Sequence, residues 1–412
     1  MKFAHMADIH LGATSDPKLR QLELNVFRRA FEMCLREGVD FVVIAGDLFH
    51  VNIPDLLVVK EATKVMMKFV ETGRKIYVVY GSHDFSPNAT SMVDILEEAG
   101  VIVRVGKPSS VNGKLRPEIV EDKRTGAKLT GISGRKLSLE REAFKYLDRE
   151  YLASLRGLKI FLFHTALDDV RRAGERFEGI SSTDLPDGFD YYAGGHVHRR
   201  IEYLKDKKIV YPGPLFTGWG IDLENTVRGE RRGFYIVDEG KPRFVDLTAF
   251  EGIYKEVDAN GMSSLALNEI LKRLATSMEV GGKVVVMRVF GELSSGKTSE
   301  VDFASFREEV MKRGAIYLHL NRSQLRSKEF EGQAVVSEDV QKIEEETFRE
   351  FSKGRRFDEP RLNAEAVALS KALLQQLKVP KMEGETEWDY ESRIKDAAME
   401  VLGIKDLLGM RA

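Results

Sequence analysis

Short apolar runs recur along the first half of the chain, and each run ends in glycine or in polar residues. Residues 41–49 (FVVIAGDLF) form such a run, which breaks at Gly46 and is followed by the carboxylate of Asp47. Similar runs lie at residues 2–8 and 75–80, and the segments between them have apolar residues three and four positions apart, as in amphipathic helices. Alternating strands and helices are typical of an α/β fold with a doubly wound parallel sheet.

The same pattern of apolar runs followed by polar residues continues further along the chain and then changes near residue 250. Apolar runs at residues 158–163, 191–194 and 208–211 again precede polar residues, and residues 233–237 are expected to be the last strand of this part. Residues 262–278 and 302–313 then read as helices, and residues 283–290 and 315–320 as strands. Beyond residue 337 the chain is charged, with helical patterns at 339–351, 362–377 and 387–402. The expected domains are therefore 1–245, 250–330 and 338–412.

Composition narrows the possible class of protein. Charged residues make up 31% of the 412 residues but the net charge is only −2, so any nucleic acid must be met by local basic patches. Arginine pairs beside the polar strand ends are candidates for such contacts: Arg171-Arg172, Arg199-Arg200 and Arg231-Arg232. The single Cys34 fits a reducing compartment, and the first ten residues (MKFAHMADIH) lack the apolar core of a signal peptide. We expect a cytoplasmic protein without a membrane span.

The polar strand ends carry an unusual set of side chains. They supply Asp8, His10, Asp47, Ser82, His83, His164, His196 and His198, which include five of the eight histidines of the chain. Ligands of α/β sheets bind outside the carboxyl ends of the strands, and carboxylates with imidazoles suit manganese, iron or zinc. Seven potential ligands exceed the needs of one divalent ion and fit two ions about 3.5–4 Å apart. Asp47 is the natural bridge between the two ions.

The motifs Asp8-x-His10, Gly46-Asp47, Gly81-x-His83-Asp84, His164 and Gly195-His196-x-His198 together resemble the motif series of the calcineurin-like metallophosphoesterases. Their order and rough spacing match that family over residues 1 to about 240. The resemblance implies a sandwich of sheets flanked by helices, to which segments 250–330 and 338–412 would add a small α/β capping domain and a C-terminal helical segment.

The resemblance also implies a role for each residue. Asp8, His10, Asp47 and His198 would hold one ion, and Asp47, Ser82, His164 and His196 the other, with Mn²⁺ as the metal of the family. His83 would donate a proton to the leaving oxygen, and Asp84 would orient His83 as a hydrogen-bond acceptor. The family usually has Asn where this chain has Ser82, so we expect a weaker second metal site, because a short hydroxyl reaches the metal less well than an amide oxygen.

The stretches Asp8-Ile9-His10-Leu11-Gly12 and Gly46-Asp47-Leu48-Phe49 resemble one branch of that family more closely. This branch is the archaeal nuclease subunit of the double-strand-break repair complex, of the SbcD or meiotic-recombination-eleven type. It implies a Mn²⁺-dependent 3′–5′ exonuclease and single-strand endonuclease that processes DNA ends as a homodimer. The C-terminal helices would bind an SbcC-like coiled-coil ABC-type ATPase. Two alternatives stay open: a phosphoesterase for small substrates such as nucleotides, and a DNA-end-binding scaffold with weak or lost catalysis.

Overall fold

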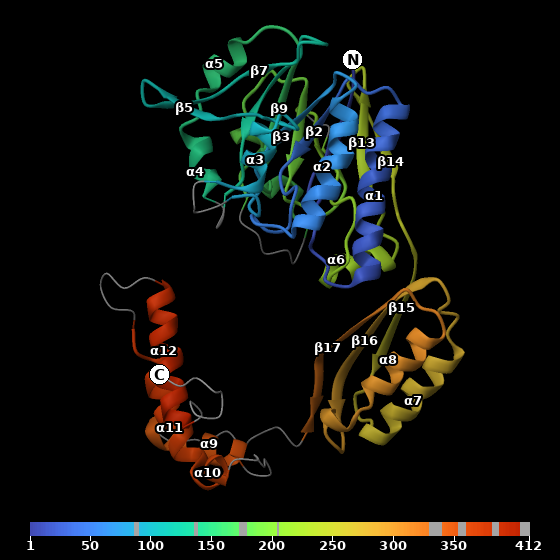
Figure 1. Ribbon diagram of the computed structural model, residues 1–412, viewed down its shortest axis with the longest axis vertical. Helices are drawn as coiled ribbons and strands as arrows, with labels where there is room; N and C mark the ends of the chain where they lie inside the picture. The colour runs from blue at the N-terminus through green and yellow to red at the C-terminus, as the bar shows by residue number, and fades with distance from the viewer. Residues whose placement is uncertain are drawn as a thin grey trace. The chain divides into compact units, whose positions relative to one another are not determined.

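The computed structural model describes residues 1–85, 90–135, 139–172, 179–203, 206–328, 340–352, 360–380 and 387–403 (Figure 1). The chain forms two compact units. The first comprises Met1–Asp258, Asn268–Phe290 and Asp302–Gln324, and the second comprises Ala259–Leu267, Gly291–Val301 and Leu325–Ala412. The candidate metal ligands all belong to the first unit.

One six-stranded sheet is built around the N-terminal strand. Its central strands are parallel, and two antiparallel strands from later in the chain extend one edge. In spatial order the strands are β14 (Lys241–Asp246), β13 (Gly233–Asp238), β1 (Lys2–Met6), β2 (Phe41–Ala45), β3 (Lys75–Val79) and β4 (Val103–Arg104). Every residue of β2 is buried, as expected for the central strand of a sheet covered on both faces.

A second six-stranded sheet contains the strands that carry the later histidines. Four of its strands are parallel, and the two edge strands run antiparallel to their neighbours. In spatial order they are β11 (Ile201–Tyr203), β12 (Ile209–Tyr211), β10 (Tyr191–Gly195), β9 (Lys159–His164), β8 (Lys128–Ile132) and β7 (Val120–Glu121). The register pairs Gly195 with His164, so the polar ends of β9 and β10 lie beside each other.

The two sheets pack face to face around a shared apolar core. Phe41 and Tyr77 of the first sheet belong to the same buried cluster as Leu162 and Tyr191 of the second. Two long helices cover the outer face of the first sheet, and two short helices pack on the outer face of the second. These are α1 (Pro17–Arg36), α2 (Leu56–Val70), α4 (Glu140–Lys145) and α5 (Arg149–Ser154) (Figure 1). The expected sandwich of sheets flanked by helices is confirmed.

Local sequence explains where the longest helix begins. The side chain of Asp16 accepts hydrogen bonds from the backbone N–H groups of Lys18 and Leu19, and Pro17 occupies the first helical turn, where its missing N–H costs nothing. The apolar positions of α1 then face the sheet. The remaining helices of this region are α3 (Met92–Glu98) and α6 (Gly220–Val227), and a hairpin is formed by β5 (Pro108–Val111) and β6 (Lys114–Pro117).

Two expectations for this region need correction. The strand pattern predicted one doubly wound sheet, but the strands from β7 to β12 form a separate sheet. The strand at residues 233–237 is not the last, because β14 follows it in an antiparallel pair. Apolar patterns report that a strand is buried but not which sheet buries it, and this explains the first error.

A three-stranded sheet with two helices follows the sandwich. Its strands are β15 (Glu251–Asp258), β16 (Lys283–Leu293) and β17 (Tyr317–Ser327), in that order, and its helices are α7 (Ser264–Ser277) and α8 (Phe303–Lys312). The pattern predicted the two helices and β16 well. It did not predict β15, and it ended β17 seven residues too early, because polar residues alternate along its exposed half.

The C-terminal part is helical, as its pattern predicts. Its helices are α9 (Val340–Ser352), α10 (Pro360–Ala364), α11 (Ala366–Leu377) and α12 (Glu387–Leu402), and α11 contacts both α9 and α12. The helix expected at 362–377 is divided at Glu365, and residue 339 lies outside the described residues. Within the described ranges, none of the helices combines the length and the apolar character needed to span a bilayer.

Candidate metal centre

The carboxyl ends of five strands, three from one sheet and two from the other, meet at one edge of the sandwich. β1 and β2 lead to Asp8 and Asp47, and the loops are joined because the backbone N–H of Asp8 donates to the Gly46 carbonyl at 3.1 Å. The backbone N–H of His83 donates to Asp47 Oδ1 at 2.8 Å, and that of His196 donates to Asp8 Oδ1 at 2.8 Å. The two aspartates therefore tie together loops from both sheets.

Glycine is required where these loops touch. A Cβ atom on Gly81 would lie 2.0 Å from Asp47 Oδ1, and one on Gly195 would lie 1.9 Å from the Ala45 carbonyl oxygen. Real Cβ atoms cannot approach other atoms so closely. The glycines in the motifs Gly81-x-His83 and Gly195-His196 thus allow the candidate ligands to converge.

Four of the candidate ligands have a strained backbone. Asp8, His10, Asp47 and His196 have φ values of 50°, 49°, 53° and 88°, a region that residues with a Cβ rarely adopt. Each such residue costs about 1–3 kcal/mol, and strain of this kind concentrates at functional sites. The surrounding hydrogen bonds hold these residues in place against that cost.

The side chains of these residues point at one another. His10 Nε2 lies 3.1 Å from His198 Nε2 and 3.5 Å from Asp47 Oδ2, and Asp47 Oδ2 lies 3.2 Å from His164 Nε2. Among the described residues, three groups each bring their ligand atoms within 4.8 Å of one another: Asp8 with His10 and His198, Asp8 with Asp47 and His164, and His10 with His50 and His83. The structure thus brings five of the seven predicted ligands into two adjoining clusters.

Burial makes these charges costly unless they are compensated. Burial alone would raise the pKa of Asp47, but the charge and hydrogen bond of His164 hold it below its usual range. Burial would likewise lower the pKa of His164, but Asp47 raises it to about 10. Burial also raises the pKa of Asp8. The carboxylate of Asp47 is therefore kept ionised, as a metal ligand must be.

The donor set fits divalent metal ions. Asp8 Oδ2 and His10 Nδ1 are buried and have no hydrogen-bond partner among the described residues, although buried polar atoms are nearly always paired. Burial lowers the pKa of His10, and burial together with the charge of His164 lowers that of His196 to about 4, so both imidazoles are neutral at pH 7. Neutral imidazoles and ionised carboxylates are the forms that bind metals, so a metal ion bound by His164 would displace the proton that Asp47 stabilises there.

Ser82 and His196 line a cavity next to these clusters. The cavity has a volume of about 570 Å³, and its walls also include Asp47, His83 and His198. The ring of His196 lies 5.2 Å from that of His164, measured between centroids. The residues assigned to the second ion thus lie at one place, although Ser82 and His196 are outside the two tight clusters.

A carboxylate that the sequence reasoning missed orients His198. Asp222 Oδ2, on α6, lies 2.7 Å from His198 Nδ1, and this contact raises the pKa of His198 against the effect of burial. The buried Arg232 donates to the backbone carbonyls of both His198 and Asp222, at 2.8 and 3.0 Å. A metal-ligating histidine usually donates its other N–H to such a partner. Asp222 lies far from the histidine motifs in sequence, and no local signal marks it.

His83 has a different partner from the one expected. Its Nδ1 lies 2.6 Å from the backbone carbonyl oxygen of His50, which can only accept a hydrogen bond, and no contact to Asp84 is found among the described residues. Asp84 instead accepts backbone N–H groups of Leu48 and Gly81, at 3.3 and 2.9 Å, and burial raises its pKa to about 6. Asp84 therefore braces the two loops that carry Asp47 and His83 and does not orient the imidazole directly.

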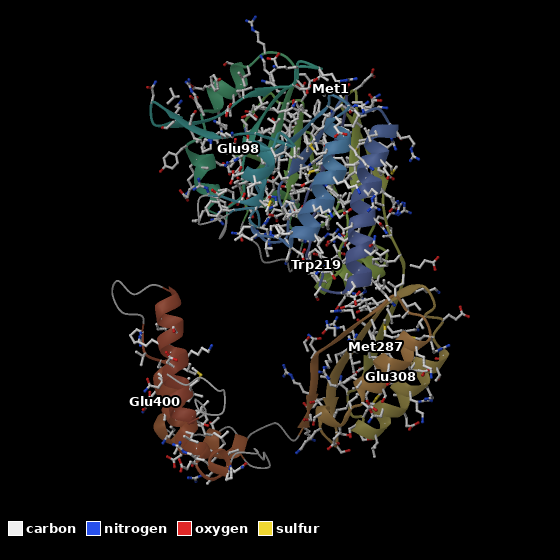
Figure 2. All side chains as sticks on the ribbon, viewed as in Figure 1. Met1, Glu98, Trp219, Met287, Glu308 and Glu400 are labelled. Carbon is white, nitrogen blue, oxygen red and sulfur yellow. The ribbon has the colours of Figure 1, made fainter. Side chains whose placement is uncertain are left out.

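Two aromatic side chains adjoin His83. His50 stacks on the His83 ring at 5.0 Å, and Trp219, labelled in Figure 2, lies 5.4 Å from His50 and 5.8 Å from His10. Neither residue belongs to the sequence motifs that predicted the metal ligands. Both are functional candidates, because they form a wall of rings beside the predicted ligands.

The arginine pairs contribute less to the outer surface than expected. Arg199 and Arg232 are buried and donate to internal carbonyl groups, of Val170 and His198 among others. Arg172 lines the cavity that holds Ser82 and His83. Arg199 lines the same cavity, but its guanidinium donates to the Val170 carbonyl, so Arg172 fits a contact with a bound phosphate better.

Comparison with known proteins agrees with this geometry. Residues 1–200 match the family model of the calcineurin-like phosphoesterases, and this match confirms the resemblance inferred from the motifs. The chain is 26% identical to the DNA double-strand break repair protein Mre11 of Archaeoglobus fulgidus over 318 residues, which cover 73% of this chain and 71% of that protein.

Two further relatives carry the same name. The protein of Methanopyrus kandleri is 29% identical over 252 residues, covering 58% of this chain and 54% of that protein. The protein of Methanococcus maripaludis is 27% identical over 245 residues, covering 58% of this chain and 63% of that protein. The chain thus matches between half and two thirds of the length of these two relatives.

Proposed function

We propose that this chain, which contains a calcineurin-like phosphoesterase domain, is a metal-dependent nuclease that processes DNA ends in double-strand-break repair. The observation that carries the proposal is the convergence of Asp8, Asp47 and His164 with His10 and His198 at one edge of the sandwich. The three relatives described above are named DNA double-strand break repair proteins, and this name supports DNA as the substrate.

The site would hold two divalent ions, with Mn²⁺ as the proposed metal. Asp8, His10, Asp47 and His198 would bind one ion, and Asp47, Ser82, His164 and His196 would bind the other. When bound, the ions would polarise the phosphodiester and lower the pKa of a coordinated water. Asp222 and Arg232 would hold His198 in position, and Asp84 would keep the loops of Asp47 and His83 together.

His83 would supply the proton for the leaving oxygen. The hydrogen bond from its Nδ1 to the His50 carbonyl fixes the orientation of the ring, and His83 lines the same cavity as Asp47 and His198. The opposite nitrogen, Nε2, is then the one free to meet a substrate. Imidazole is the commonest general acid in such reactions.

The first experiment is nucleotide release from end-labelled double-stranded and single-stranded DNA, with and without Mn²⁺. We expect Mn²⁺-dependent release that is lost in His83→Ala and kept in His319→Ala, which changes a histidine of β17 outside the metal clusters. Comparing the two end labels and a circular single strand would separate 3′–5′ exonuclease from endonuclease activity. Turnover of a phosphomonoester without release from DNA would favour the small-substrate enzyme, and DNA binding without any turnover would favour the scaffold.

We also propose a homodimer formed through α2 and α3. Ile53 and Leu56 are 73% and 78% exposed at the start of α2, and Leu57 and Ile95 are exposed as well. The backbone N–H of Met92 at α3 donates to the Asn52 carbonyl, which joins the two exposed segments. Exposed apolar groups that cluster in this way mark interaction surfaces.

The solution mass of the wild-type chain and of two variants would test the dimer. Leu56→Glu should yield the monomer mass by light scattering, because a charge in the interface would be desolvated. Leu265→Glu, which changes an equally exposed leucine on α7, is the matched control and should remain dimeric. A monomeric wild-type chain, or a dimeric Leu56→Glu variant, would contradict this interface.

The C-terminal helices would bind a coiled-coil ATPase of the SbcC type. We propose this from the expected division into a nuclease domain (1–245), a capping domain (250–330) and a helical segment (338–412). Leu377 of α11 remains exposed on the packed helices, which gives a partner an apolar contact. Co-purification with such an ATPase, compared between the full chain and Leu377→Glu, would test the contact.

A further inference from the structure

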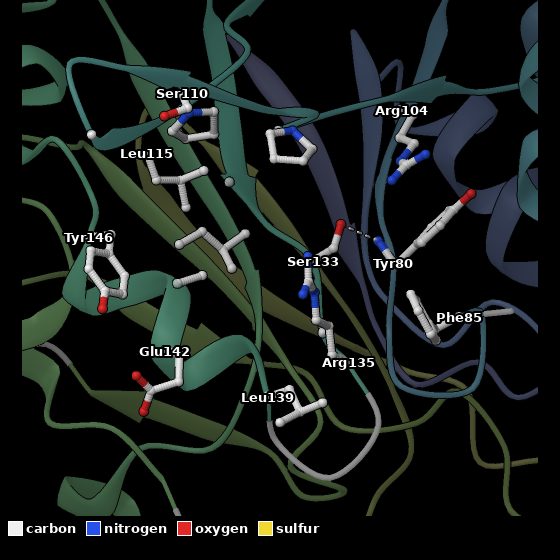
Figure 3. A pocket seen from close by; sticks show the side chains of 18 residues that line it. Tyr80, Phe85, Arg104, Ser110, Leu115, Ser133, Arg135, Leu139, Glu142 and Tyr146 are labelled. Carbon is white, nitrogen blue, oxygen red and sulfur yellow. Dashed lines mark hydrogen bonds between the residues drawn. The ribbon is translucent and has the colours of Figure 1, made fainter. Parts of the chain in front are cut away.

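A second cavity lies at the same end of the β3 and β8 strands as the candidate metal centre. Its volume is about 420 Å³, within the usual range of about 300–1,000 Å³ for ligand sites. Its walls come from the segment after β3, the segment after β8, the β5–β6 hairpin and α4 (Figure 3). Most of the lining is apolar, with Ile132 and Leu139 among the aliphatic side chains.

Part of the wall of this cavity comes from the loop that carries His83 and from the segment after β8, which lies against His164. Tyr80 and Phe85, which line the cavity, flank the segment from Gly81 to Asp84. The backbone N–H of Gly134 donates to the Tyr80 carbonyl at 2.7 Å, and a Cβ atom on Gly134 would lie 2.7 Å from His164 Cδ2. Gly134 therefore lies between the cavity and the His164 ring.

Aromatic rings face this cavity from two sides. Tyr80 and Phe85 lie on one side in Figure 3, and Tyr146 lies on the other. Tyr146 is 62% exposed and the neighbouring Leu139 is 56% exposed, so both leave large apolar surfaces in contact with water at the rim. Flat, apolar ligands would cover these surfaces.

Two arginines line the cavity; Arg104 is paired with Asp94 at 3.3 Å, so the uncompensated positive charge within the described part of the chain is that of Arg135. The guanidinium of Arg104 stacks on the Tyr80 ring at 3.9 Å, and its buried Nε has no hydrogen-bond partner among the described residues. The guanidinium of Arg135 extends toward Ser133 in Figure 3 and makes no hydrogen bond or ion pair to the described residues. Glu142 also lines the cavity, but its charge is balanced by Lys145 at 2.5 Å.

We propose that this cavity is a nucleotide subsite, in which a base stacks on the aromatic side chains and a phosphate binds Arg135. Base stacking on aromatic rings and bidentate contacts from arginine to phosphate are the usual means of binding single-stranded nucleic acid. The proposal rests on the proposed function, because the subsite would accept a nucleotide near the one whose phosphate meets the metal ions. The same chemistry suits a free mononucleotide, and the experiment separates these two sources.

The test compares three variants of the full chain. Tyr146→Ala removes a ring and Arg135→Ala removes a charge, both at exposed positions. Arg124→Ala is the control, because it removes an exposed arginine at the opposite end of β8, where it pairs with Asp40. Anisotropy of a fluorescein-labelled oligodeoxythymidine measures binding of a single strand, and saturation-transfer NMR with dAMP measures binding of a free nucleotide. Thermal melting monitored by circular dichroism verifies that each variant is folded.

We expect Tyr146→Ala to weaken binding of the single strand at least about fivefold, the low end for loss of one stacked base, and Arg135→Ala to do the same. Tyr146→Phe, which keeps the ring, should restore binding. Loss of the dAMP signal with unchanged strand binding would assign the subsite to a free nucleotide. If Tyr146→Ala and Arg135→Ala both bind the single strand and dAMP as well as the Arg124→Ala control does, the proposal is overturned.

A separate assay keeps this test independent of the proposed function. Hydrolysis of bis(p-nitrophenyl) phosphate by the wild-type chain with Mn²⁺ reports the metal centre without any base or strand. Absence of this activity together with variant-sensitive nucleotide binding would refute the nuclease and retain the subsite. Activity on the diester with strand binding unaffected by either variant would refute the subsite and retain the phosphodiesterase.

Discussion

Replacing Asp222 by Asn tests how the fold prepares His198 for a metal ion. The carboxylate lies 2.7 Å from His198 Nδ1, and the contact raises the pKa of the imidazole. Asn has nearly the same shape and still accepts a hydrogen bond, but it lacks the charge. The variant should therefore leave the ring in place and make its Nε2 a weaker electron-pair donor to a metal ion.

The size of the effect follows from the geometry. Hydrogen bonds to charged groups contribute about 1.5–3 kcal/mol, and every 1.4 kcal/mol corresponds to about tenfold in affinity. The side chains of His198 and Asp222 are 30% and 14% exposed, so water screens part of this interaction. We therefore expect Mn²⁺ affinity at the site of His198 to fall by about tenfold, the lower end of the range for partners of metal ligands.

Calorimetric titration with Mn²⁺ would measure both sites of the wild-type chain and the variant. The site assigned to His164 and His196 should keep its affinity, while the site assigned to His198 weakens. NMR titration of the metal-free chain should show a lower pKa for His198 in the variant. Asp187→Asn, which removes an exposed carboxylate paired with Lys207, is the control. Wild-type affinity at both sites of Asp222→Asn would refute the reasoning.

Two other substitutions test the centre and its support. Ser82→Asn should tighten the second Mn²⁺ site, because the amide oxygen reaches further than the hydroxyl, and equal metal occupancy of the two chains would contradict this. Glu23 is buried, accepts the backbone N–H of Gly12 at 2.8 Å, and burial raises its pKa from 4.5 to about 7. The folded chain thus favours the protonated carboxyl. The contribution of Glu23 to the stability of the fold is therefore complete below pH 4.5 and is lost as the pH rises through about 7. At about 1.4 kcal/mol per pKa unit, the free energy of unfolding of Glu23→Gln, relative to that of the wild type, should rise by about 3 kcal/mol between pH 4.5 and pH 8. Urea unfolding would measure this, and a difference that stays constant with pH would contradict it.

The candidate ligands were predictable because their signal is local. A run such as residues 41–49 predicts a buried strand, and a polar residue directly after it must lie at the carboxyl end of that strand. Five histidines and two aspartates at such positions therefore predicted which edge of the sheets carries the candidate ligands. The Oδ2 atom of Asp47, the predicted bridge, lies within 3.5 Å of nitrogens from both His10 and His164.

The contacts that tune these residues were beyond prediction from the sequence. Asp222 reaches His198 from a helix that begins 22 residues later, and His50 meets His83 through a backbone carbonyl that no motif encodes. The nucleotide cavity likewise joins Tyr80 with Tyr146, which are far apart in the chain.

The sequence by itself determined the apolar strands that lead to the candidate metal centre and the helices α1 and α2 between the first three, and it determined which side chains stand at those strand ends. Both follow from periodicity and turn residues, which act over a few positions along the chain. Only the tertiary structure decided that the strands form two sheets, that Asp84 braces loops, and that Arg199 and Arg232 point inward. These outcomes depend on packing between segments that are distant in sequence. The residues that bury a side chain or accept its hydrogen bonds there cannot be predicted from a local pattern.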